Sequence, residues 1–104
     1  MVDMTDVAPM PLRALVEAHR DEIKTVVARH KGREVAIFGS VARGDESSDS
    51  DIDFLVDMDG GASLFDLIRM EDELSSLLGR AVDVVERGGL KPRDNDIRRD
   101  AVAL

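Results

Sequence analysis

Two sequence segments constrain this chain most: FGSVARG at residues 38–44 and SDIDFLV at residues 50–56. They predict a strand, a Gly-Ser turn that opens a short helix, and a second strand that carries Asp51 and Asp53. Side chains alternate along a strand, so these two carboxylates project from one face, about 5–7 Å apart, and repel unless a cation lies between them. The Gly-Ser turn, in contrast, offers helix N-terminal N–H groups to an anion. Together, the two features indicate chemistry with a magnesium-bound nucleotide.

Composition fits one small domain. At 104 residues, the chain should bury roughly two-thirds of the surface that its unfolded form exposes. The absence of cysteine excludes disulfides, thiolate metal sites and cysteine nucleophiles. No apolar run approaches the ~20 residues of a membrane span, and residues 1–10 lack a signal-peptide pattern. We therefore expect a cytoplasmic protein without a membrane partner.

The acidic net charge indicates which kind of macromolecule this chain can bind. The net charge is −8, and the basic residues are scattered apart from a modest C-terminal cluster. The chain has no Tyr or Trp on which bases could stack. Direct nucleic acid binding is therefore not expected, since it calls for a basic stripe. An acidic surface suits a basic protein partner better.

Periodicity predicts an α/β (α+β) fold, with the order α-β-α-β-α-β-α around a small mixed β-sheet with flanking helices. Residues 1–11 are expected to form a flexible tail, and residues 12–104 a single domain. The expected helices cover residues 12–30, 40–43, 64–78 and 93–103, and the expected strands cover residues 34–38, 51–58 and 80–86. Ser63 is the expected N-cap and Gly79 the expected C-terminal cap of the third helix.

A third carboxylate, Asp83, lies on the third expected strand. If that strand neighbours the second one, Asp51, Asp53 and Asp83 converge on one patch. Such a patch suits Mg²⁺, and two ions about 3.5–4 Å apart could clamp an in-line phosphoryl displacement. A D-x-D pair alone is better explained as solvated charge, but the Gly-Ser turn at this spacing favours the metal site.

The Gly-Ser turn supplies the candidate phosphate contacts. Gly39 lacks a Cβ and lets the backbone approach a phosphate closely. Ser40 can donate its hydroxyl to a phosphate oxygen or cap the short helix. Arg43 can pair with a triphosphate, or equally with an acidic residue of the turn at residues 45–49. A Walker A loop is excluded, because no G-x-x-x-x-G-K-[ST] occurs.

The combined pattern G-S-x-x-x-G, spacer, D-x-D and later Asp resembles that of the DNA polymerase beta-type nucleotidyltransferase superfamily. The fuller form G-S-x-A-R-G-x5-S-D-x-D is similar to the minimal nucleotidyltransferase (MNT) branch, as is the tail at residues 89–104. The resemblance covers roughly residues 12–104 and implies a nucleotidyltransferase fold. The matching positions are Gly39, Ser40, Gly44, Ser50, Asp51, Asp53 and Asp83.

The resemblance implies a role for each candidate residue. Gly39 and Ser40 hold the nucleotide triphosphate, and Arg43 and Ser50 are further candidates for nucleotide binding. Asp51 and Asp53 bind Mg²⁺, and Asp83 helps to activate the acceptor hydroxyl. The candidate catalytic and metal-binding residues are therefore Asp51, Asp53 and Asp83, with Mg²⁺, expected as two ions, and ATP as substrate.

The MNT branch also implies a biological role. Its members are commonly antitoxins whose partner is an all-helical HEPN-domain ribonuclease toxin, so a hetero-oligomer with the toxin is possible. The resemblance implies that AMP passes from ATP to a tyrosine of that toxin. We expect little beyond a catalytic core in this chain, so an acceptor would bring its own binding surface, as a protein does. Two alternatives stay open: a small-molecule (antibiotic-type) nucleotidyltransferase, and a non-catalytic antitoxin that acts by binding alone.

Overall fold

A computed structural model describes residues 11–45 and 50–104 of the chain. The flexible tail that we expect at residues 1–11 lies outside the described residues, apart from Pro11, the N-cap of the first helix. Two of the acidic side chains considered as partners of Arg43, at positions 46 and 49, also lie outside them.

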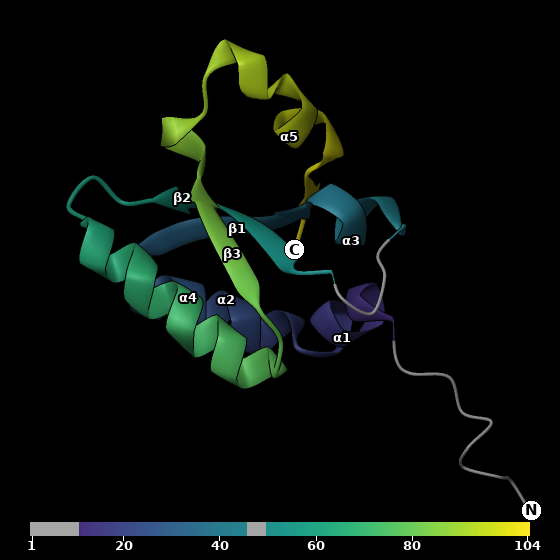
Figure 1. Ribbon diagram of the computed structural model, residues 1–104. Coiled ribbons are helices and arrows are strands. Elements are labelled where there is room, and N and C mark those ends of the chain that lie inside the picture. Colours follow the sequence, from purple (N-terminus) through teal and green to yellow (C-terminus); the bar gives the residue numbers. More distant parts are fainter. Residues whose placement is uncertain (1–10, 46–49) are drawn as a thin grey trace, which may run out of the picture.

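The core of the fold is a four-stranded mixed sheet with the strand order β3-β2-β1-β4 (Figure 1). Its strands are β1 (Gly32–Phe38), β2 (Ile52–Met58), β3 (Val82–Glu86) and β4 (Val102–Ala103). Strand β2 pairs antiparallel with β1 and parallel with β3, while β4 pairs antiparallel with β1. The mixed sheet and the three expected strands are confirmed.

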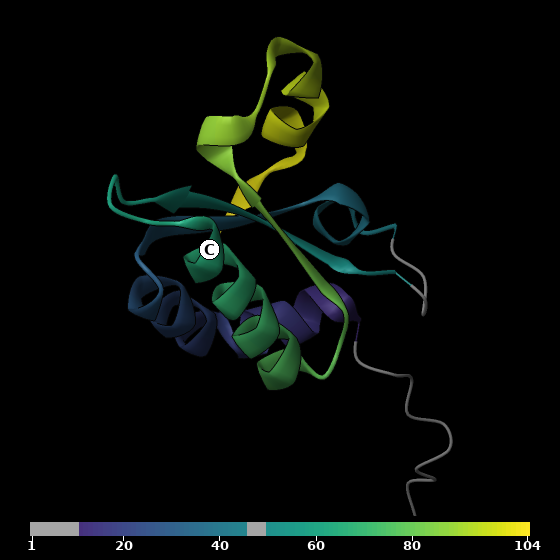
Figure 2. The ribbon, with the colours of Figure 1, turned by 60° about the vertical axis from the view of Figure 1, so that its left-hand side comes forward.

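Helices cover the two faces of the sheet unequally (Figure 2). One face packs on α1 (Leu12–Ala18), α2 (Arg20–Arg29) and α4 (Leu64–Leu78), with the larger apolar core between the layers. The other face carries a smaller cluster beneath the C-terminal segment, which comprises η2 (Arg87–Gly89), η3 (Pro92–Asp94) and α5 (Asn95–Asp100). Helix α3 (Gly39–Arg43) follows directly after β1.

The single helix expected over residues 12–30 is wrong, because α1 and α2 are separate helices that meet at His19. In a continuous helix, the His19 N–H would bond to the Leu15 carbonyl. Here the His19 ring Nδ1 donates to that carbonyl at 3.0 Å, and the His19 N–H bonds instead to Val16 O at 3.1 Å. The side chain thus competes with its own backbone and breaks the helix.

The C-terminal helix expected over residues 93–103 is also wrong in extent. Helix α5 ends at Asp100, and the next residues form β4, pairing Val102 with Ile37 and Ala103 with Ala36. The Leu104 N–H then donates to Val35 O at 3.0 Å. The outer edge of β1 would otherwise present unpaired backbone groups, so sheet pairing outweighs helix continuation.

Helix α4 has the two ends that the sequence predicts. Asp66 accepts a hydrogen bond from the Ser63 N–H at 2.8 Å, which satisfies one free donor of the first turn. Gly79 ends the helix in the left-handed conformation, with φ of 65°. Neither this helix of 15 residues nor any other in the described ranges is long and apolar enough to cross a membrane.

Gly79→Ala should lower the free energy of unfolding by about 1 kcal/mol, because Ala adopts positive φ only with strain. A Cβ at Gly79 would meet no atom within 4 Å, so the cost is conformational. Gly61→Ala is the matched control, since that site is equally open and lacks positive φ. Urea denaturation measures both variants, and equal stability of the two would contradict the assignment of the cap.

Candidate active site

The position of Asp53 is set by the two neighbours of β2. In the antiparallel pair, Asp53 lies opposite Phe38, the last residue of β1. In the parallel pair, it lies opposite Asp83. Residues paired across neighbouring strands point to the same face, so both carboxylates project on the side of α5 rather than the side of α2 and α4. The expected convergence of Asp53 and Asp83 on neighbouring strands is confirmed.

Asp51 lies just before β2, which begins at Ile52 rather than at residue 51 as expected. It is exposed. The chain around it is held from both sides, because the Ile52 N–H donates to Ala81 O at 3.0 Å and Arg80 Nη2 donates to Ser50 O at 3.2 Å. The negative charge of Asp51 acts on Asp53, so Asp51 lies near the pair of carboxylates at the end of the strand.

The electrostatics of the cluster centre on Asp53. Partial burial raises its pKa above the ordinary value, and the negative charges of Asp83 and Asp51 raise the pKa further. The positive charge of Arg43 acts in the opposite direction. The charged form of Asp53 is therefore disfavoured until a cation compensates for the neighbouring negative charge.

The donor set fits a hard divalent cation that brings further ligands with it. All three side chains offer carboxylate oxygens, which Mg²⁺ prefers. Within the described part of the chain, no three His, Cys, Asp or Glu side chains are arranged to hold a metal ion by themselves. Mg²⁺ usually takes one or two carboxylates together with substrate phosphates and water.

Gly39 is required next to this cluster for a reason that sequence reasoning missed. Its φ is +72°, a conformation that favours glycine. A Cβ at this position would lie 2.5 Å from Oδ2 of Asp53. The residue therefore makes room for the Asp53 carboxylate, in addition to any phosphate that approaches the turn.

Ser40 lies in the first turn of α3 and is half-buried. Its carbonyl accepts a hydrogen bond from the Asp45 N–H at 3.0 Å. Among the described residues, its hydroxyl has no hydrogen-bond partner and makes no capping bond.

Arg43 bridges α3 to the C-terminal segment. Its Nη1 donates to Asp100 Oδ2 at 2.9 Å and its Nε to Asp45 Oδ2 at 3.2 Å. Hydrogen bonds to Asp100 first, and then to Asp45, raise its pKa further. Asp45 belongs to the acidic turn that the sequence offers as a partner, whereas Asp100 was missed because it lies 57 residues away. A guanidinium has five N–H donors, so some remain for a phosphate.

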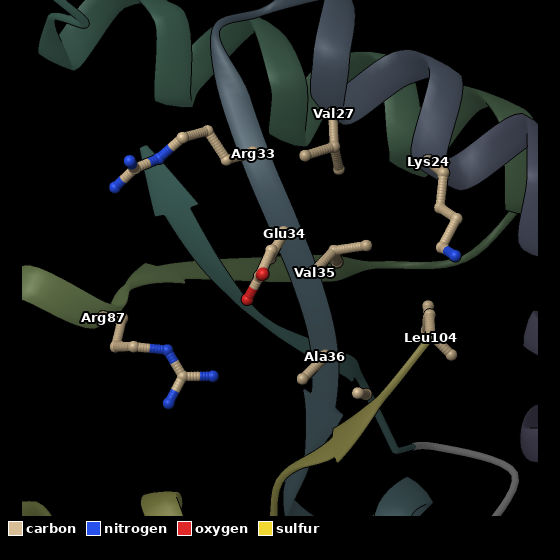
Figure 3. Close-up of a pocket in the computed structure, with 9 residues that line it drawn as sticks. Lys24, Val27, Arg33, Glu34, Val35, Ala36, Arg87 and Leu104 are labelled. Carbon is tan, nitrogen blue, oxygen red and sulfur yellow. The ribbon is translucent and has the colours of Figure 1, made fainter. Parts of the chain in front are cut away.

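A separate hollow of about 450 Å³ contains none of the candidate residues (Figure 3). It opens beside the first half of β1, next to the C-terminal end of β4. Its polar lining comes from Lys24, Arg33, Glu34 and Arg87. The carboxylate cluster lies at the other end of β1, opposite Phe38, so the two features are distinct.

Comparison with known proteins agrees with this geometry. Residues 20–103 match the nucleotidyltransferase domain family. The protein adenylyltransferase MntA of Thermococcus cleftensis is 39% identical over 80 residues, which is 77% of this chain and 78% of the relative. A solved structure of a proposed minimal nucleotidyltransferase superposes with a TM-score of 0.79 at 40% identity, covering 88% of this chain and 95% of the other.

A more distant structure shares the fold. It is a chain from the complex of a tri-AMPylated Shewanella oneidensis HEPN toxin with an MNT antitoxin. Its TM-score is 0.64 at 17% identity, and the match covers 84% of this chain and 69% of that one. The family match, the MntA relative and the carboxylate cluster beside a Gly-Ser turn agree. The chain therefore belongs to the nucleotidyltransferase domain family, in its protein adenylyltransferase branch.

Proposed function

We propose that this chain is the antitoxin of a toxin–antitoxin pair and transfers AMP from ATP, with Mg²⁺, to a tyrosine of a HEPN ribonuclease toxin. The observation that carries the proposal is the placement of Asp53 between Asp83 and the Gly39–Ser40 turn. A carboxylate cluster there adjoins the backbone N–H groups and the Ser40 hydroxyl of a turn that can donate to a triphosphate. This is the arrangement that nucleotidyl transfer requires.

We assign a separate role in nucleotide binding, metal binding or proton transfer to each candidate residue. The Ser40 hydroxyl and the N–H groups of the turn would hold the triphosphate, with Arg43 and Ser50 as further candidates for nucleotide contacts. Asp51 and Asp53 would hold Mg²⁺, which neutralises phosphate charge when bound. Asp83 would take the proton of the acceptor hydroxyl or hold a second ion.

The transfer step conserves atoms and charge. The phenolic oxygen of the acceptor attacks the α-phosphorus of ATP, and the bond from that phosphorus to the bridging oxygen breaks. Pyrophosphate leaves, and the phenol proton passes to the Asp83 carboxylate. In-line geometry and charge compensation lower the barrier of such a displacement.

One relative and one structural neighbour support a protein acceptor. MntA, at 39% identity, is itself named a protein adenylyltransferase. In the more distant complex, the HEPN toxin carries three AMP groups. The net charge of −8 on this chain would favour a basic RNA-binding face as its target. AMP added to that face would repel and obstruct RNA.

The deciding experiment incubates this protein with ATP, Mg²⁺ and the HEPN-type protein encoded beside its gene, followed by mass spectrometry. Tyrosine-linked AMP, one unit or several, is the expected result. An inhibited but unmodified partner would favour an antitoxin that acts by binding alone. If the two proteins do not interact, a small-molecule nucleotidyltransferase would become the better-supported function.

Asp53→Asn should lower the rate of AMP transfer by roughly 100-fold or more. The same variant should raise the melting temperature at pH 7 by a few degrees, because it removes a carboxylate that its neighbours repel. The raised pKa of Asp53 means that its favourable contribution to folding is fully present below the ordinary value of 3.8 and is lost as pH rises through the folded-state pKa. The stability gain of the variant should therefore vanish below about pH 3.8.

Asp72→Asn is the matched control, since it removes one exposed carboxylate on α4. Thermal melts between pH 3 and 8 compare both variants with the wild type. An Asp53→Asn protein with the same stability gain as the control would contradict the mutual repulsion at the site. Retained turnover in Asp53→Asn would contradict its catalytic assignment.

Gly39→Ala should lose roughly tenfold to hundredfold in kcat/KM for ATP, because the new Cβ must displace the Asp53 carboxylate, and displacements near 1 Å are this costly. Gly79→Ala has nearly the same backbone strain without a clash, so it controls for stability. Steady-state kinetics and urea denaturation of both variants separate the two effects. An equal loss of activity in both variants would show that only strain matters.

Asp83→Asn should lower kcat by roughly 10²–10⁴-fold and leave the Kd for ATP almost unchanged. Proton transfer from the acceptor develops only near the transition state, so the ground-state complex loses little. Single-turnover kinetics and ATP titration provide the two readouts. A proportionate loss of ATP affinity would make Asp83 an ordinary ground-state ligand instead.

A further inference from the structure

The large apolar side chains exposed in the described residues are gathered in one place. Leu64, Phe65 and Ile68 are 70%, 69% and 49% exposed, and all three lie in the first two turns of α4. The same helix buries Met70, Leu74 and Leu78 against the sheet. The three exposed side chains, hereafter the α4 patch, therefore occupy a face of the helix that its own core does not use.

The α4 patch adjoins an open edge of the sheet. Strand β3 is an outer strand, with β2 as its one neighbour in the sheet. Figure 1 shows β3 and α4 together on the near side of the molecule, and residues of the two elements are in contact. Helix α4 starts after the end of β2 and runs back toward the start of β3, so the patch lies beside the far end of β3.

The expected nucleotide contacts and the expected acceptor contact of the active site lie at different strands. Its nucleotide side is the α3 turn at the end of β1, whereas Asp83 lies on the outer strand and is exposed. The β3 edge therefore offers a direct route to Asp83 for an acceptor hydroxyl. Strand β3 has 5 residues, so roughly 13 Å separates the Cα atoms of its first and last residues. A protein that contacts the α4 patch must therefore extend along β3 and around its outer edge, because Asp83 projects on the side of α5 and not on the side of α4.

The net charge of the chain favours one kind of protein partner for the α4 patch over another. A second copy of this chain would bring another net charge of −8 to the interface. Within the α4 surface itself, Arg69 and Asp72 are both exposed, so the rim is mixed rather than basic. A basic protein with an apolar recess is attracted by the overall charge and can bury the aromatic and aliphatic side chains of the patch.

We propose that Leu64, Phe65 and Ile68 form the docking surface for the protein acceptor, a basic partner that lies along the β3 edge and presents its hydroxyl to Asp83. This inference rests on the proposed function, and it adds the surface by which the acceptor is selected. Exposed Leu, Phe and Ile cost solvation free energy in the isolated chain, and a partner that covers them recovers it.

The test uses the full chain with Leu64→Gln, Phe65→Gln and Ile68→Gln, singly and together, and the HEPN-type protein encoded beside its gene as acceptor. Since the three side chains are exposed, the variants should fold like the wild type in thermal melts. The triple variant should raise KM for the acceptor about tenfold or more, with ATP affinity unchanged. Ala28→Ser, an exposed apolar residue on α2, is the matched control and should change neither value.

The outcomes separate this inference from the proposed function. AMP transfer by the wild type with the same acceptor KM in the triple variant would overturn the docking surface and leave the function standing. No transfer by the wild type would overturn both. Sedimentation velocity of the chain without a partner tests for self-association. If the wild type forms a dimer and the triple variant does not, a second copy of the chain covers the α4 patch, and the proposal is overturned.

Discussion

The register of β2 against its two neighbours is the constraint on which the site depends. Antiparallel pairing brings the end of β1, and with it the Gly39 turn, to Asp53, while parallel pairing brings Asp83 to its other side. A slip of one residue would turn Asp53 toward the apolar core and separate it from both. The apolar residues that alternate with Asp53 along β2 hold this register, so the core of the fold positions a charge cluster that is itself unfavourable.

Much of this arrangement could be predicted from the sequence, because the responsible signals are local. The spacing of Asp51 and Asp53 fixes a shared direction along an extended chain, and a Gly-Ser pair after an apolar run marks a turn into a helix. The ends of α4 follow from Ser63 and Gly79 for the same reason. Asp83 could be placed on a strand, but only the sheet order made it a neighbour of Asp53.

The missed features depend on contacts between distant segments or on competition that leaves no periodic signal. The break at His19 arises because a ring nitrogen takes the Leu15 carbonyl. Strand β4 pairs through two residues, too few for alternation to appear. The Arg43–Asp100 bridge joins two segments that lie 57 residues apart, and the clash of a Gly39 Cβ with Asp53 exists only in three dimensions.

The central claim is that the carboxylate cluster and the α3 turn together bind a divalent cation with a nucleotide. Mn²⁺ replaces Mg²⁺ at oxygen sites and broadens the NMR signals of nearby nuclei, so amide spectra recorded with ATP and trace Mn²⁺ locate the ion directly. The account predicts selective broadening at Gly39, Ser40, Asp51, Asp53 and Asp83. Broadening confined to other acidic positions, such as the surface of α2 or α4, would contradict it.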